Sequence, residues 1–189
     1  GYYDHNMVVM SERVSDHLPK TNKYSPKQRL WYIRAKEVII SSGSIERPLV
    51  FGNNDTPGVM LSSAAKEYLK VYGVLAGKKP LIFTNNDSGY EAAIEFKKNG
   101  INPIILDTRK EPNSEIINEA KSLNINIKFS YVVVAAKGYK KVKSADVAKI
   151  SDDKKDLSKI ENVNCDCICV SGFWTPTIHL ASQSGNKTK

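Results

Sequence analysis

Cysteine and histidine are scarce in this sequence. The 189 residues include three cysteines and three histidines. The cysteines (Cys165, Cys167 and Cys169) stand in one short run, with no second ligand group elsewhere, and the histidines are isolated. A zinc site usually needs a turn between ligands and a second pair, so we expect no metal site. The pattern favours small buried hydrophobes lining one face of a core strand and a reducing, cytoplasmic compartment.

Catalytic signatures are equally scarce. The sequence holds no Cys-x-x-Cys pair, which removes the usual dithiol of disulfide reductases. It also holds no legible nucleophilic triad, because no cysteine or serine stands in a pattern that pairs it with a histidine. Neither dithiol chemistry nor a nucleophilic triad is therefore expected on this chain.

Membrane spans and nucleic-acid tracts are also missing. No apolar run approaches the roughly 20 residues that cross a bilayer, and the first residues lack a signal pattern. The net charge is +8, but the lysines are spread along the chain, so we expect neither a membrane nor a nucleic-acid partner. The sequence starts without Met and a strand-like segment follows at once, which suggests a piece of a longer chain; processing and a removed tag are the alternatives.

The clearest pattern that is present is a β-α-β-α-β unit. Short apolar runs alternate with amphipathic segments, which predicts a parallel sheet with right-handed crossovers, an α/β fold of the Rossmann type. The predicted strands and helices cover residues 80–83, 89–99, 103–106, 114–123 and a start near 125.

The flanking segments predict further elements. Residues 7–14 and 28–33 are expected to be two strands joined by a polar loop, and 37–40 a short strand. A helix is expected over 62–71, with Ser62 or Ser63 as N-cap and Gly73 as the stop. Alternation over 129–150 predicts an antiparallel excursion, and 165–170 a buried strand. The predicted domains are 1–58 (the C-terminal part of a first dinucleotide-binding domain), 59–163 (a nested NAD-binding-like domain) and 164–189 (a return to the first).

The loop after the first strand of the unit is the first candidate binding site. In a dinucleotide fold, glycines there let phosphate approach backbone N–H groups at a helix N-terminus. Of three expected glycines the loop keeps only Gly89, whose main role is close helix–strand packing, while Thr84 and Asn86 replace the other two. Asp87 adds a negative charge beside the pyrophosphate position, so the loop is a degraded phosphate cradle.

Further candidates lie at other strand ends. Asp107 ends the second strand about 20 residues later, where an acid binds the ribose hydroxyls of NAD; a solvated strand-end Asp is the alternative, and Arg109 weakens the preference for NAD over NADP. The small-residue turns at Ser42, Gly43 and Ser44 and at Gly172 would let backbone approach a cofactor. Trp174 beyond the last turn fits either a cofactor cover or plain packing.

These pieces, in this order, resemble the middle of a two-domain flavoprotein of the pyridine nucleotide-disulphide oxidoreductase superfamily. Three strings, residues 1–6 (GYYDHN), 45–55 (IERPLVFGNND) and 83–88 (FTNNDS), are similar to the alpha subunits of heterotetrameric sarcosine oxidases. The resemblance implies a complex that oxidatively demethylates sarcosine to glycine and forms hydrogen peroxide. It implies NAD on the alpha subunit, with Ser42, Gly43 and Gly172 as contacts.

The same resemblance implies beta, gamma and delta partner subunits and the remainder of the alpha chain. It places FAD on the beta subunit, FMN at the interface between alpha and beta, and tetrahydrofolate near the end of alpha, none of them on this chain. It also places amine oxidation on the beta subunit, which implies no catalytic residue for it here. Two alternatives stay open: a subunit of a related two-component amine or opine dehydrogenase, and a vestigial module that docks partners without binding nucleotide.

Overall fold

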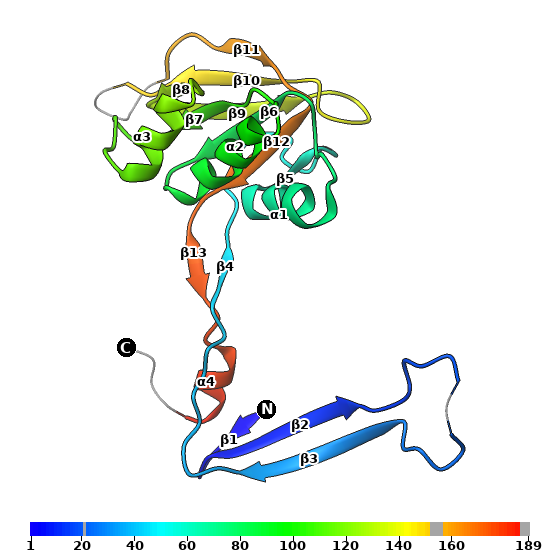
Figure 1. Ribbon diagram of the computed structural model, residues 1–189. Helices are drawn as coiled ribbons and strands as arrows, with labels where there is room; N and C mark the ends of the chain where they lie inside the picture. Colours follow the sequence, from blue (N-terminus) through cyan, green and yellow to red (C-terminus); the bar gives the residue numbers. More distant parts are fainter. Residues whose placement is uncertain (21, 152–156, 186–189) are drawn as a thin grey trace. The chain divides into compact units, whose positions relative to one another are not determined.

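The computed structural model describes residues 1–20, 22–151 and 157–185 (Figure 1). The chain forms two compact units, one of Gly1–Ile45 with Thr175–Lys189 and one of Glu46–Trp174. We call these the flanking unit and the central unit. The predicted domains have other limits, at 58 and 163, and their assignment to a first and a nested dinucleotide-binding domain stays a prediction.

The central unit is built on a five-stranded parallel sheet. Its strands run in the order β5-β12-β6-β7-β8. They are β5 (Val59–Leu61), β12 (Cys167–Ser171), β6 (Pro80–Thr84), β7 (Ile104–Asp107) and β8 (Asn126–Phe129), with helices α1 (Ser62–Tyr72), α2 (Ser88–Lys98) and α3 (Glu115–Ser122) between them. The predicted α/β class and parallel sheet are confirmed. The strand expected to return to the first domain lies inside this sheet, beside β6.

The two faces of this sheet are covered differently, as Figure 1 shows. Side chains alternate along a strand, so Ile82 packs with the helices while Leu81 and Phe83 pack on the opposite side. That opposite side carries the predicted antiparallel excursion, which forms a three-stranded sheet. Its strands are β9 (Tyr131–Lys137), β10 (Ser144–Lys149) and β11 (Glu161–Asn164), in the order β11-β10-β9.

The flanking unit holds a second antiparallel sheet, β1-β2-β3. Its elements are β1 (Tyr2–Tyr3), β2 (Met7–Arg13), β3 (Gln28–Arg34) and α4 (His179–Gln183). Strands β2 and β3 confirm the predicted pair at 7–14 and 28–33. Two short strands, β4 (Ser44–Glu46) and β13 (Trp174–Pro176), pair with each other and contain the points where the chain passes between units.

Two sequence predictions about local structure are wrong. Residues 37–40 form no strand, and Ile39 is 89% exposed. An apolar run becomes a strand only when neighbouring strands take its hydrogen bonds, and none of the described strands pairs with it. The three cysteines also do not share one face: Cys167 and Cys169 pack with the helices, whereas Cys165 precedes β12 and packs on the other side.

The start of α1 also differs from its prediction, whereas its end does not. Neither Ser62 nor Ser63 is the N-cap, because Leu61 holds that position without a side-chain cap. The Glu46 carboxylate instead accepts the Ser63 N–H at 3.0 Å. Gly73 ends the helix in the left-handed conformation, φ 63°, as expected.

Candidate functional site

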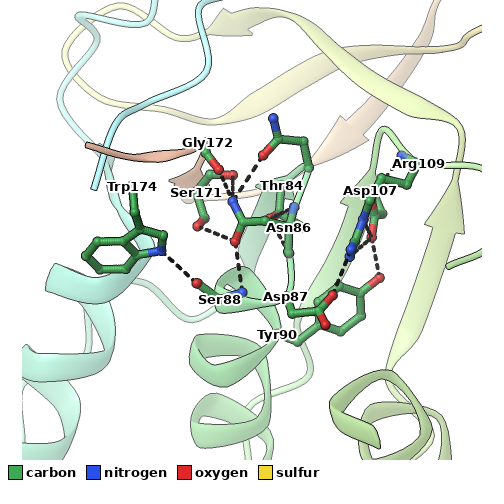
Figure 2. A network of polar contacts seen from close by, with 11 residues as sticks. Thr84, Asn86, Asp87, Ser88, Tyr90, Asp107, Arg109, Ser171, Gly172 and Trp174 are labelled. Carbon is green, nitrogen blue, oxygen red and sulfur yellow. Dashed lines mark hydrogen bonds and ion pairs between the residues drawn. The ribbon is translucent and has the colours of Figure 1, made fainter. Parts of the chain in front are cut away.

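The degraded phosphate loop lies at the carboxyl edge of the parallel sheet. Strands β6, β7 and β12 end there side by side, with Thr84 opposite both Asp107 and Ser171. This edge is where open α/β sheets bind ligands. The structure thus brings together Thr84, Asn86, Asp107 and Gly172 (Figure 2), and a fifth predicted residue, Gly89, packs against Thr84.

The Asn86 side chain fills the loop with hydrogen bonds. Its amide group donates to the carbonyls of Ser171, at 3.3 Å, and Gly172. Its carbonyl oxygen accepts the Ser88 N–H at 2.9 Å and lies 3.3 Å from the Ser171 hydroxyl. Ser88 is the first residue of α2, so its N–H is one of the helix-end donors that a phosphate would use. In this structure that donor is already satisfied from within the chain.

Thr84 and Gly89 fix the geometry of the same turn. The Thr84 hydroxyl accepts the Asn86 N–H at 3.1 Å and donates to the Asn86 carbonyl at 2.8 Å. A Cβ on Gly89 would lie 2.6 Å from the Thr84 Cβ, closer than side chains can pack. Gly89 therefore allows α2 to approach β6, in agreement with the packing role expected for the third glycine.

Asp107 belongs to a buried polar network. Its side chain has no exposed surface, and it accepts hydrogen bonds from the Tyr90 hydroxyl at 2.7 Å and from Arg109 Nη2 at 2.8 Å. Arg109 also reaches Asp87, with 2.7 Å between Nη1 and Oδ1. The charge that Asp87 was expected to place at the pyrophosphate position is thus paired, and the Asp107 oxygens are engaged within the chain.

The protonation states follow from these contacts. Burial, reinforced by the neighbouring Asp107 carboxylate, raises the pKa of the Tyr90 phenol far above its usual value. The carboxylates of Asp107 and Asp87 raise the pKa of Arg109, although its partial burial opposes this. At neutral pH the hydroxyl therefore keeps its proton, the guanidinium stays charged, and both can donate to Asp107.

The remaining predicted residues make backbone contacts. In the flanking unit, the Ser42 hydroxyl donates to the Thr177 carbonyl at 2.5 Å, and the Gly43 carbonyl accepts the Thr177 N–H at 2.9 Å. Gly43 has φ 67° with open space around it, and Ser44 begins β4. In the central unit, a Cβ on Gly172 would lie 2.6 Å from the Arg47 carbonyl, so that glycine admits a neighbouring segment of the same chain.

Sequence reasoning missed several members of this network. Tyr90 was placed only as part of a helix, and Ser171 only as part of a turn. Trp174 donates its indole N–H to the Ser88 hydroxyl at 2.8 Å, and its two expected roles, cofactor cover and packing, both stay predictions. A tyrosine at the third position of a helix carries no signal that its hydroxyl will meet a strand end, so only the fold reveals the contact with Asp107.

Similarity to curated proteins covers nearly the whole chain. It is 35% identical over 188 residues to the "Sarcosine oxidase subunit alpha" of Rhizobium meliloti (strain 1021), covering 99% of this chain and 18% of that protein. The protein of the same name from Corynebacterium sp. (strain P-1) is 33% identical over 190 residues, covering 99% and 19%. The chain is homologous to a region of the sarcosine oxidase alpha subunit. It spans about a fifth of the length of these relatives, and no protein-family profile matches it.

Solved structures support the fold. The thioredoxin reductase of T. acidophilum superposes with a TM-score of 0.67 at 18% identity, covering 86% of this chain and 53% of that one. The Lactococcus lactis thioredoxin reductase gives 0.61 at 18% identity, covering 83% and 50%. These matches confirm a fold like that of the thioredoxin reductases. None of the helices in the described residues is long and apolar enough to cross a membrane.

Proposed function

We propose that this chain is the structural framework of a sarcosine oxidase-type alpha subunit, and that its Thr84–Gly89 loop does not hold a dinucleotide. The homology to alpha subunits supports the first part. The absence of a dinucleotide from the loop is proposed because the Asn86 side chain accepts the Ser88 N–H where a phosphate would bind. The residues present at this loop do not fit a pyrophosphate, since donors and carboxylates alike are engaged within the chain.

In the complete complex, the chain would join the remainder of an alpha subunit and beta, gamma and delta partners. Sarcosine oxidation to glycine, with FAD, FMN and tetrahydrofolate, would then take place on parts other than this one. Neighbouring genes for a flavin-bearing beta subunit and small gamma and delta subunits would favour this assignment over a two-component amine or opine dehydrogenase.

Binding of NAD at the turn formed by Ser42, Gly43 and Ser44 is the second candidate function. The observation that favours it is Gly43, whose positive φ and open surroundings leave the backbone accessible. Gly172, the other expected contact, is less suitable because the Arg47 and Pro48 backbone covers it.

A calorimetric titration of NAD into the purified chain separates these functions. The framework proposal predicts no saturable heat from a chain whose circular dichroism shows it folded. Two variants locate any binding that is seen: Asp107→Asn, which keeps the shape of the buried carboxylate, and Ser44→Glu, which places a charge that repels phosphate at the exposed turn. Binding weakened by Asp107→Asn would overturn the proposal, whereas binding lost only in Ser44→Glu would support the second candidate.

A further inference from the structure

A polar cavity lies in the central unit where the first turns of α1 and α2 meet. Its volume is about 280 Å³, and residues from both helices, from β4 and from β13 line it. One water needs roughly 10–15 Å³ of such volume, so the cavity has room for a small organic molecule. It is separate from the Thr84–Gly89 loop, with which it shares only Ser88.

Glu46 is the main charged group of this cavity. The residue is 5% exposed, and its Oε2 accepts both the N–H and the hydroxyl of Ser63, at 3.0 and 2.5 Å. Its other oxygen, Oε1, is buried with no hydrogen-bond partner among the described residues. Buried polar atoms are almost always satisfied, and this acceptor is available to a donor from a ligand.

Two further features of the wall define what that ligand would be. The Ser62 hydroxyl is fully buried and also has no partner within the described part of the chain. The Trp174 indole is held in place by its hydrogen bond to Ser88, and an indole face is the best aromatic partner for a cation. A buried carboxyl oxygen beside an indole is the chemistry that recognises organic ammonium ions.

The charges around the cavity favour a cation as well. Lys66 and Glu91 also line it and form an ion pair at 2.5 Å, so their charges offset each other. Glu46 is then the lining residue whose carboxylate is left to attract a cation. A metal ion fits less well, because the described residues contain no group of three or more histidine, cysteine or acidic ligands suited to one.

We propose that this cavity binds a small alkylammonium ion, with Glu46 Oε1 as acceptor and counter-ion, the Ser62 hydroxyl as a second contact and Trp174 as the aromatic wall. The site is independent of the proposed framework function, because neither Glu46 nor Ser62 belongs to the Thr84–Gly89 loop. A result for or against NAD binding therefore leaves it untouched.

Tryptophan fluorescence provides a direct test. The chain has two tryptophans, so Trp31→Phe leaves Trp174 as the sole reporter at the cavity. We would titrate this variant with dimethylammonium chloride and, in parallel, with potassium chloride at equal ionic strength. The matched pair Glu46→Gln and Glu67→Gln, each in the Trp31→Phe background, compares the buried carboxylate on β4 with an exposed carboxylate on α1.

The proposal predicts a saturable emission change with dimethylammonium and none with potassium. Glu46→Gln should weaken it about tenfold or more, since a hydrogen bond to a charged group is lost, and Glu67→Gln should leave it unchanged. Ser62→Ala, which keeps every Glu46 contact, should weaken binding severalfold and serves where Glu46→Gln does not fold. An equal response to potassium, no saturable change in the folded chain, or undiminished binding in a folded Glu46→Gln or Ser62→Ala variant would overturn the proposal.

Discussion

Replacing Asp107 by alanine should destabilise the central unit strongly. The substitution leaves the Tyr90 hydroxyl and the Arg109 guanidinium without the buried acceptor that both now use. Removing one partner of a buried ion pair costs about 3–5 kcal/mol. The Arg109 side chain is 28% exposed, so water recovers part of the loss and we expect about 3 kcal/mol. In a chain of this size, about 2–4 °C per kcal/mol gives a fall in Tm of roughly 6–12 °C.

Thermal unfolding followed by Trp174 fluorescence, in the Trp31→Phe background, measures this change within the central unit. Tyr90→Phe keeps the pair of Asp107 with Arg109 and should cost about 1 kcal/mol. Asp55→Ala removes an exposed carboxylate from the same unit and should stay within about 0.5 kcal/mol of the parent. An Asp107→Ala variant as stable as Asp55→Ala would refute the buried network. If the network is real, Asp107→Asn is the better variant for binding studies.

Four further predictions concern the core and the loop. Gly89→Ala should cost about 1–3 kcal/mol, because its methyl group would meet the Thr84 Cβ at 2.6 Å; a urea midpoint equal to the parent's would contradict this. All three cysteines are buried, so a thiol reagent at pH 8 should label none of them rapidly and all of them in guanidinium. For Cys165, burial also raises the pKa of the thiol to about 12. The same shift should lower stability as pH rises from about 8.5 towards 12, because thiols of the unfolded chain ionise first. Asn86→Asp should destabilise by about 2 kcal/mol, more than Asn86→Ala, because an acceptor then faces the carbonyls of Ser171 and Gly172; equal unfolding midpoints for the two variants would count against the hydrogen-bond assignment.

The regular part of the fold could be predicted because its signals are local. Short apolar runs separated by amphipathic helices led to β6, α2, β7 and α3, and the alternating stretch after 129 led to the antiparallel sheet. The strand predicted at 37–40 failed for a non-local reason, since no described strand pairs with it. Likewise, the place of β12 between β5 and β6 depends on a pairing across more than 80 residues, which no local pattern encodes.

The location of the candidate site could be predicted from the sequence, but the hydrogen bonds that its residues make could not. The replacement of two glycines by Thr84 and Asn86 indicated a degraded loop, and the structure brings the expected residues to one sheet edge. The sequence could not predict the contacts of Asn86 and Asp107, because these depend on hydrogen-bond partners outside their own segments. The partners are the Ser171 and Gly172 carbonyls for Asn86, and Tyr90 and Arg109 for Asp107. Side-chain hydrogen bonds of this kind are set by the fold and not by spacing.

Hydrogen-bond satisfaction distinguishes the carboxyl edge of the sheet from the α1–α2 cavity as places where the central unit could hold a ligand. At the sheet edge, the Ser88 N–H, the Asp107 carboxylate and the Arg109 guanidinium all have partners within the chain, so a nucleotide would have to displace existing bonds. At the α1–α2 cavity, Glu46 Oε1 and the Ser62 hydroxyl have none among the described residues, and a ligand would add bonds without breaking any. Because a buried unsatisfied polar group costs about 1–3 kcal/mol, an occupant of the cavity recovers free energy that a nucleotide at the edge would have to spend. The carboxyl edge of the sheet, where this fold class usually binds its ligand, is therefore less favourable for a ligand than the α1–α2 cavity. The cavity is the better place to look for a bound small molecule.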